Sequence, residues 1–293
     1  MPTAASAPHP PSAILLIHCP DRQGIVAAVS AFIFKNNGNI LFLDQHVDAD
    51  RNVFFMRIEW DLENFIIPSN KIGEYFDTLI AKKFEMQWEI HFPHEIPRMA
   101  LFVSKLPHCL YDILSRWKSR EFEVDIPLII SNHEELAPVA QQFNIPFYHL
   151  PITKTNKQEQ EQKQIQLLKE YDIELIVLAR YMQILTAEFI SHYQNKIINI
   201  HHSFLPAFPG ARPYHSAFER GVKIIGATSH YVTAELDAGP IISQDVISVS
   251  HADSVDDLVR KGRDLEKVIL SRAIWHYLQR QILTFQNRTV IFS

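Results

Sequence analysis

The stretch from Lys196 to Asp245 decides the fold of this chain. It reads K-I-I-N-I-H-H-S-F-L-P-A-F-P-G over residues 196–210 and G-A-T-S-H-Y-V-T-A-E-L-D-A-G-P-I-I-S-Q-D over residues 226–245. The apolar residues 197, 198 and 200 predict a short buried strand that stops at two histidines and a Pro/Gly loop. Asn199 and His201 are two positions apart, so on a strand both side chains point to the same face.

A second apolar run, residues 222–232, leads into a polar turn that carries Glu235, Asp237 and Gly239. An amide, an imidazole and a carboxylate therefore stand at the ends of two predicted strands. These three groups can donate to an oxyanion, move a proton and orient an imidazole, as acyl chemistry requires.

These motifs resemble a known signature. N-I-H-H-S-F-L-P at residues 199–206, His230 and L-D-A-G-P at residues 236–240 are similar to those of the 10-formyltetrahydrofolate-dependent formyltransferase fold. The resemblance covers about residues 98–281. It implies an enzyme that hydrolyses or transfers the formyl group of that folate.

Composition narrows the class of protein. The chain has 293 residues, of which 47% are hydrophobic and 21% charged, as in globular proteins with one large or two ordinary domains. A formal net charge of −5 argues against nucleic acid or a membrane surface as a partner. No apolar run reaches the roughly 18 residues that span a bilayer. We find no secretory signal at the N-terminus and expect a cytoplasmic protein.

The first ninety residues follow a β-α-β-β-α-β order, which is the ferredoxin-like pattern. The predicted strands are residues 13–18, 39–47, 52–60 and 85–91, and the helices are residues 24–34 and 70–82. Residues 1–12 form a Pro/Ala/Ser tail that we expect to be disordered.

The run C-P-D-R-Q-G-I-V at residues 19–26 resembles an ACT domain over about residues 13–93. The resemblance implies a regulatory module that binds an amino acid at a dimer interface, and hence a homo-oligomer. In one interpretation, the turn formed by Asp21, Arg22, Gln23 and Gly24 presents backbone donors to an effector carboxylate. In the other, the same turn is structural and the module only dimerises.

Prolines in the run at residues 93–97 mark residues 94–97 as a linker, and a larger domain follows over residues 98–293. Strands and helices alternate from residue 98 onward, which predicts an α/β doubly wound, mostly parallel sheet. Ligands of such sheets bind at the carboxyl ends of the strands, where we expect Asn199 and Asp237.

No glycine occurs between Gly73 and Gly210, so the first strand–helix turn of this domain reads S-K-L-P-H-C at residues 104–109. A Rossmann or P-loop fingerprint is therefore excluded there. In the glycinamide-ribonucleotide formyltransferases this turn is glycine-rich and holds the nucleotide phosphate. The turn of this chain instead resembles that of the formyltetrahydrofolate deformylases.

The resemblance also implies substrate contacts. The segment A-R-Y-M-Q-I-L at residues 179–185 matches the part of the family that wraps the pterin ring; otherwise it is a helix-capping connector. The implied substrate-binding residues are Arg180, Tyr181, Met182, Gln183, Ile184, Leu185, Glu235 and His230. Upstream of this segment, the Gln/Glu/Lys-rich run at residues 154–169 favours a surface helix.

Three residues carry the predicted chemistry. Asp237 orients the imidazole and accepts from water, His201 donates to the oxyanion or shuttles the proton, and Asn199 donates to the formyl oxygen. Taken singly, each has a structural alternative, because strand-end histidines and turn carboxylates are common. A zinc site is not expected, since adjacent His201 and His202 would point to opposite faces of a strand. We expect neither a metal nor a redox cofactor.

The resemblance to the deformylases predicts hydrolysis of 10-formyltetrahydrofolate to formate and tetrahydrofolate, with the formate used in purine synthesis. Two alternatives remain at this point: a formyltransferase that acts on an amine acceptor, and a non-catalytic sensor of folate and amino acids. The glycine-free turn disfavours the first alternative, and the intact Asn199, His201 and Asp237 disfavour the second.

Overall fold

The computed structural model describes residues 11–206 and 213–292, and the chain divides into two compact units. The first unit comprises Met1–Glu95, Arg280–Leu283 and Val290–Ser293, and the second comprises Ile96–Gln279 and Thr284–Thr289. The division between Glu95 and Ile96 falls inside the Pro-rich run. Residues 1–10 of the expected tail and the A-F-P-G loop at 207–210 lie outside the described residues.

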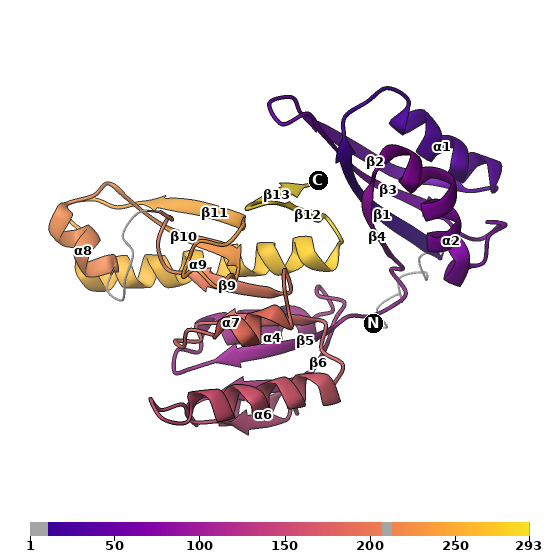
Figure 1. The fold of residues 1–293 in the computed structure, drawn as a ribbon. Helices are drawn as coiled ribbons and strands as arrows, with labels where there is room; N and C mark the ends of the chain where they lie inside the picture. Colours follow the sequence, from indigo (N-terminus) through magenta and orange to yellow (C-terminus); the bar gives the residue numbers. More distant parts are fainter. Residues whose placement is uncertain (1–10, 207–212, 293) are drawn as a thin grey trace, which may run out of the picture. The chain divides into compact units, whose positions relative to one another are not determined.

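The first unit is built on a four-stranded antiparallel sheet with the strand order β2-β3-β1-β4 (Figure 1). Its elements are β1 (Ser12–Pro20), α1 (Ile25–Lys35), β2 (Asn39–Asp48), β3 (Val53–Asp61), α2 (Ser69–Phe76), a π-helical turn η1 (Asp77–Ala81), α3 (Lys82–Phe84) and β4 (Gln87–His91). The predicted βαββαβ order is confirmed. The tail is shorter than expected, because Ser12 already pairs with Asp61 and its hydroxyl donates to Glu59 over 3.0 Å.

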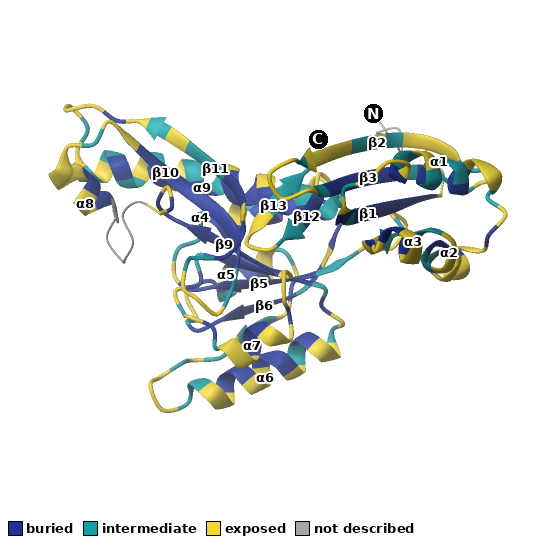
Figure 2. Ribbon diagram, turned by 45° about the horizontal axis from the view of Figure 1, so that its top comes forward, coloured by how far each residue is buried: buried dark blue, intermediate teal, exposed yellow. Residues whose placement is uncertain are grey.

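The core of this unit follows from hydrophobic periodicity. Ile25, Val29, Phe32 and Ile33 form one apolar stripe of α1, and all four are buried. They pack on inward-facing side chains of the central strands β1 and β3, which Figure 2 shows as buried.

The second unit contains a seven-stranded sheet with the order β11-β10-β9-β8-β5-β6-β7. The strands are β5 (Arg98–Val103), β6 (Asp125–Ser131), β7 (Phe147–His149), β8 (Leu175–Ala179), β9 (Ile197–His201), β10 (Ile224–Tyr231) and β11 (Ile241–Ser248). The five neighbouring strands β9, β8, β5, β6 and β7 are parallel to one another, as predicted. β10 runs antiparallel to both of its neighbours, which the sequence pattern did not indicate.

Helices cover both faces of this sheet (Figure 1). They are α4 (His108–Lys118), α5 (Ala137–Gln142), α6 (Lys157–Glu170), α7 (Ala187–Ser191), α8 (Pro213–Arg220) and α9 (Val255–Leu278). α9 packs against β9, β10, β11 and α4. Its start is fixed by a capping box in which Ser254 and Asp257 each bond the other's backbone N–H. A short hairpin, β12 (Ile282–Phe285) and β13 (Arg288–Ile291), follows α9.

Helix α6 is a surface helix, as expected, but part of its polar face is buried. Gln160, Glu161 and Gln164 are 8%, 4% and 0% exposed. Gln164 Nε2 donates to Tyr181 Oη over 3.2 Å, and the backbone N–H of Thr186 donates to Glu161 Oε1 over 3.1 Å. These side chains hold the segment after β8 in place. The polar groups of Gln164 Nε2 and Glu161 therefore serve buried hydrogen bonds and not solvation.

Within the described residues, no helix combines the length and the apolar character needed to cross a membrane.

Candidate active site

The site is built on the pairing of β9 with β10. Their antiparallel register places Asn199 opposite His230 and Ile200 opposite Ser229. Asn199 and His201 share one face of β9 because side chains alternate along a strand. Asn199 Nδ2 lies 3.2 Å from His230 Nε2, which brings the amide and the second imidazole together.

The carboxylate comes from the connection between β10 and β11. Because β10 is antiparallel to β9, this connection leaves the sheet beside the amino-terminal half of β9, where Val232 N–H donates to Ile197 O over 2.9 Å. The turn folds back, and Asp237 Oδ2 lies 3.3 Å from His201 Nδ1. Asp237 therefore lies beside His201, the last residue of β9, at the carboxyl end of that strand, as expected.

The turn that presents Asp237 is tightly constrained. Asp237 adopts a positive φ of 55°, a region that few residues other than glycine populate. A Cβ at Gly239 would lie 1.8 Å from the carbonyl oxygen of Tyr231, so only glycine allows the turn to approach β10 this closely.

Asp237 sets the tautomer of His201. The hydrogen bond from His201 lowers the pKa of Asp237 below its ordinary value, so the carboxylate is ionised and accepts the Nδ1 proton. His201 is 6% exposed, and its Nε2 is buried without a hydrogen-bond partner among the described residues. In the neutral ring this atom carries a lone pair. A buried, unpartnered nitrogen of this kind indicates a position for a ligand atom or a water.

The carbonyl group of Tyr231 determines which of Asn199 and His230 donates the hydrogen bond between them. His230 Nδ1 lies 2.9 Å from Tyr231 O, which can only accept, so Nδ1 carries the proton. Burial lowers the pKa of His230, which keeps the ring neutral and makes Nε2 an acceptor. Asn199 Nδ2 therefore donates one hydrogen to His230 and has a second hydrogen for another acceptor. His230 Nε2 is 3.8 Å from Asp237 Oδ1.

The prediction that His201 and His202 point to opposite faces is wrong. β9 ends at His201, so the two-residue alternation does not extend to His202. The two rings are stacked instead, with centroids 5.2 Å apart and an interplanar angle of 19°.

The segment after β8 adjoins the first strand–helix turn. The backbone N–H of Met182 donates to Ser104 Oγ over 3.0 Å, and Ser104 donates to Asn132 Oδ1 over 2.6 Å. Met182 and Ile184 are exposed, whereas Tyr181 and Leu185 are buried. The segment thus leaves the apolar side chains of Met182 and Ile184 accessible to a ligand. Arg180 directs its side chain inward, to Glu266 and His202, and Glu235 is exposed.

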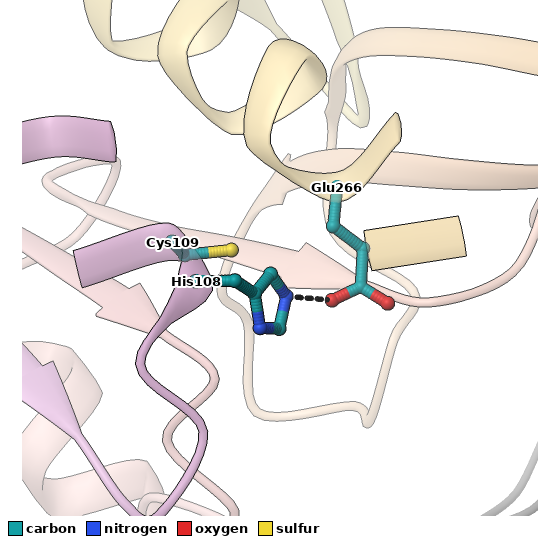
Figure 3. A group of neighbouring side chains, drawn as sticks. All are labelled: His108, Cys109 and Glu266. Carbon is teal, nitrogen blue, oxygen red and sulfur yellow. Dashed lines mark hydrogen bonds and ion pairs between the residues drawn. The ribbon is translucent and has the colours of Figure 1, made fainter. Parts of the chain in front are cut away.

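Sequence reasoning missed a buried group next to these residues. Among the described residues, one cluster has side chains of the kinds that can ligate a metal. It consists of His108 and Cys109 at the start of α4 and Glu266 on α9 (Figure 3). This group does not suit a metal. Burial raises the pKa of Cys109 well above its ordinary value, which disfavours the thiolate, and Arg180 already neutralises Glu266. In the sequence, only the turn S-K-L-P-H-C, in which His108 lies four positions after Ser104, drew attention to this region.

Comparisons with known proteins agree with this geometry. Residues 97–274 match the family described as formyl transferase. The second unit therefore belongs to the formyl transferase class of proteins. The chain is 56% identical to a formyltetrahydrofolate deformylase of Synechocystis sp. over 96% of this chain and 99% of the relative. It belongs to the formyltetrahydrofolate deformylase family.

Solved structures give the same result. A formyltetrahydrofolate deformylase from Pseudomonas syringae pv. tomato superposes with a TM-score of 0.94 and 44% identity, covering 97% of this chain and 95% of that one. A glycinamide ribonucleotide transformylase from Symbiobacterium toebii has a TM-score of 0.65 and 29% identity. It covers 69% of this chain and 97% of that one. The transformylase thus accounts for little more than two thirds of the chain, whereas the deformylase spans both units.

Proposed function

We propose that this protein hydrolyses 10-formyltetrahydrofolate to formate and tetrahydrofolate. The observation that carries this proposal is the arrangement of Asp237, His201 and Asn199, in a chain that matches deformylases over nearly its full length. A base, an orienting carboxylate and an amide donor are what acyl transfer to water requires.

The proposed mechanism uses His201 as the proton carrier. Its Nε2 accepts a proton from water as the water oxygen bonds to the formyl carbon, and Asp237 stabilises the imidazolium that forms. Asn199 donates its second amide hydrogen to the formyl oxygen as negative charge develops there. His201 then returns the proton to N10 of the folate, the C–N bond breaks, and formate and tetrahydrofolate leave.

The proposed substrate-binding residues surround this centre. Backbone groups of residues 180–185 and the exposed side chains of Met182 and Ile184 hold the pterin ring, while His230 fixes Asn199. Glu235 lies in the same turn as Asp237. The proposed reaction uses no metal, because His201, Asp237 and Asn199 supply the base, its orientation and the oxyanion donor, and it uses no redox cofactor, because no oxidation state changes. We further propose a cytoplasmic enzyme whose formate supplies purine synthesis.

The test is formate release from the purified full-length chain and 10-formyltetrahydrofolate with no acceptor present. We expect formate and tetrahydrofolate in equal amounts. Formate that appears only after an amine acceptor is added, together with formylated amine, would assign the protein to the transferases instead. Folate binding with neither product would identify a sensor.

The first unit is proposed to pair with a second copy and to bind an amino acid. Its edge strand β2 is largely exposed (Figure 2), and the exposed apolar residues on it are Ile40, Leu41, Leu43 and Val47. Unpaired edge strands with apolar side chains favour association with another chain. The turn Asp21–Gly24 precedes α1, whose N-cap Gly24 supplies no side-chain cap. The first N–H groups of α1 can therefore bind an effector carboxylate.

We expect light scattering to give a multiple of the single-chain mass, and Leu41→Lys to lower that mass by placing charge on the edge strand. Glu63→Lys, at an exposed position of the same unit, serves as the control. A single-chain mass at every concentration of the unmodified protein would overturn the pairing.

A further inference from the structure

Glu266 is a buried carboxylate that the proposed mechanism does not use. It lies on α9, is 1% exposed, and accepts hydrogen bonds from His108 Nε2 over 2.8 Å and from Tyr214 Oη over 2.7 Å. Figure 3 shows the carboxylate of α9 turned toward His108 at the start of α4. Arg180 Nε lies 3.5 Å from the same oxygen that His108 contacts.

This carboxylate is held in its ionised form. Burial alone raises the pKa of Glu266, but the hydrogen bonds from His108 and Tyr214 and the charge of Arg180 outweigh burial and hold the pKa below its ordinary value. A buried charge is tolerated only when it is paired and hydrogen-bonded, and Glu266 meets both conditions.

The fold makes room for this arrangement. A Cβ at Gly262, one turn before Glu266 on α9, would lie 2.1 Å from Tyr214 Oη. The glycine therefore lets the Tyr214 ring approach the helix closely enough to reach the carboxylate.

Arg180 connects Glu266 to His202. It follows β8 with a positive φ of 64°, and its Nη1 contacts His202 Nδ1. A guanidinium can only donate, so His202 Nδ1 accepts and the ring proton lies on Nε2. Burial and the charge of Arg180 lower the pKa of His202 to about 4, so this ring is neutral at physiological pH.

His202 in turn stacks on His201. The chain of contacts runs from Glu266 to Arg180, then to His202, and then to the imidazole of His201, whose Nδ1 contacts Asp237. A stacked neutral ring limits the rotation of His201 without adding a charge beside it. Ring orientation matters, because a misplacement of about 1 Å at a reacting group costs roughly 100-fold in rate.

We propose that Glu266 is a positioning residue: through Arg180 and His202 it fixes the orientation of His201 for hydrolysis. The proposal rests on the proposed function of His201. His108 and Tyr214 hold the carboxylate, and none of these five residues takes part in the proposed proton transfer or bond changes.

The test uses the full-length protein with Glu266→Gln, which keeps the size of the side chain and removes its charge. We expect kcat for formate release to fall by about 10- to 100-fold with KM within about twofold, because orientation and not binding is lost. We also expect the ¹⁵N signals of His202 to lose the pattern of an accepting Nδ1 and a protonated Nε2.

Two further variants keep the proposal falsifiable. Tyr214→Phe removes one hydrogen bond to the same carboxylate and leaves Arg180 in place, so we expect kcat to change by less than about threefold. Arg180→Lys keeps the charge and loses the planar fork, so it should lower kcat as Glu266→Gln does.

Unchanged His202 signals in Glu266→Gln, or a fall in kcat no larger than that of Tyr214→Phe, would overturn the positioning role. If Glu266→Gln does not fold, a kcat for Arg180→Lys within twofold of the unmodified protein overturns it. The histidine spectra require no turnover. A failure of this proposal is therefore distinguishable from a protein that releases no formate at all.

Discussion

Asp237→Asn is expected to lower kcat for formate release by about 10³- to 10⁴-fold, with little change in KM. The ionised carboxylate lies 3.3 Å from His201 Nδ1, holds the proton on that atom and stabilises the imidazolium that forms during water attack. The amide has nearly the same shape but no charge. It can also present an N–H to Nδ1, which would favour the tautomer whose Nε2 cannot accept a proton.

The measurement is the steady-state rate of formate release, with the melting temperature recorded to verify folding. Asp256→Asn is the matched control, since Asp256 is exposed in the first turn of α9. We expect the control to stay within about twofold of the unmodified protein, as surface substitutions usually have small effects. Asp237→Asn with more than a tenth of the original kcat would contradict the assigned role.

Asn199→Ala is expected to lower kcat by about 10²- to 10³-fold, the usual loss when one oxyanion donor is removed. The amide donates one hydrogen to His230 over 3.2 Å, which fixes its plane and directs the second hydrogen into the site. A donor held in this way does not have to reorganise as charge develops on the formyl oxygen.

Tetrahydrofolate provides a control for Asn199→Ala, because this product lacks the formyl oxygen. We expect its dissociation constant to stay within about twofold of that of the unmodified protein, as the variant removes a contact made to the formyl group alone. A parallel loss of product affinity would show that Asn199 supports the pterin site instead.

The turn after β5 bears on whether water or an amine is the acceptor of the proposed reaction. Its Ser104 bonds Asn132 and the backbone of Met182, and its His108 reaches Glu266 on α9. The turn is therefore filled with side chains that bond to the enzyme itself. A glycine-rich turn would leave its backbone N–H groups accessible to an anion. This arrangement is consistent with water as the acceptor.

Some predictions succeeded because they depended on local periodicity. The alternation of strands and helices from residue 98 onward predicted the mostly parallel sheet. The capping box of Ser254 and Asp257 at the start of α9 is likewise a local pattern. The i and i+2 spacing of Asn199 and His201 places both side chains on one face of β9. Hydrophobic periods and capping side chains act within a few residues, so they can be recognised in a single sequence.

Other features required the folded chain. In the sequence, the polar face of α6 is typical of a solvated surface. In the folded chain, Gln164 and Glu161 on this face are buried and form hydrogen bonds with Tyr181 and Thr186. His202 stacks on His201 because β9 ends between them, and a strand end is poorly determined by local pattern. The antiparallel direction of β10 likewise depends on its pairing with β9 and β11, which lie in other parts of the chain.

The sequence by itself determined the two types of unit and the set of groups available for formyl chemistry: an amide, an imidazole and a carboxylate at Asn199, His201 and Asp237. Only the tertiary structure decided how these groups are oriented. Asp237 reaches His201 by a turn that folds back from β10, and Glu266 is 86 positions from Arg180 in the chain (266 − 180) yet pairs with it in the core. Hydrogen bonds and ion pairs between residues far apart in sequence depend on packing of the whole domain, and no local pattern specifies them.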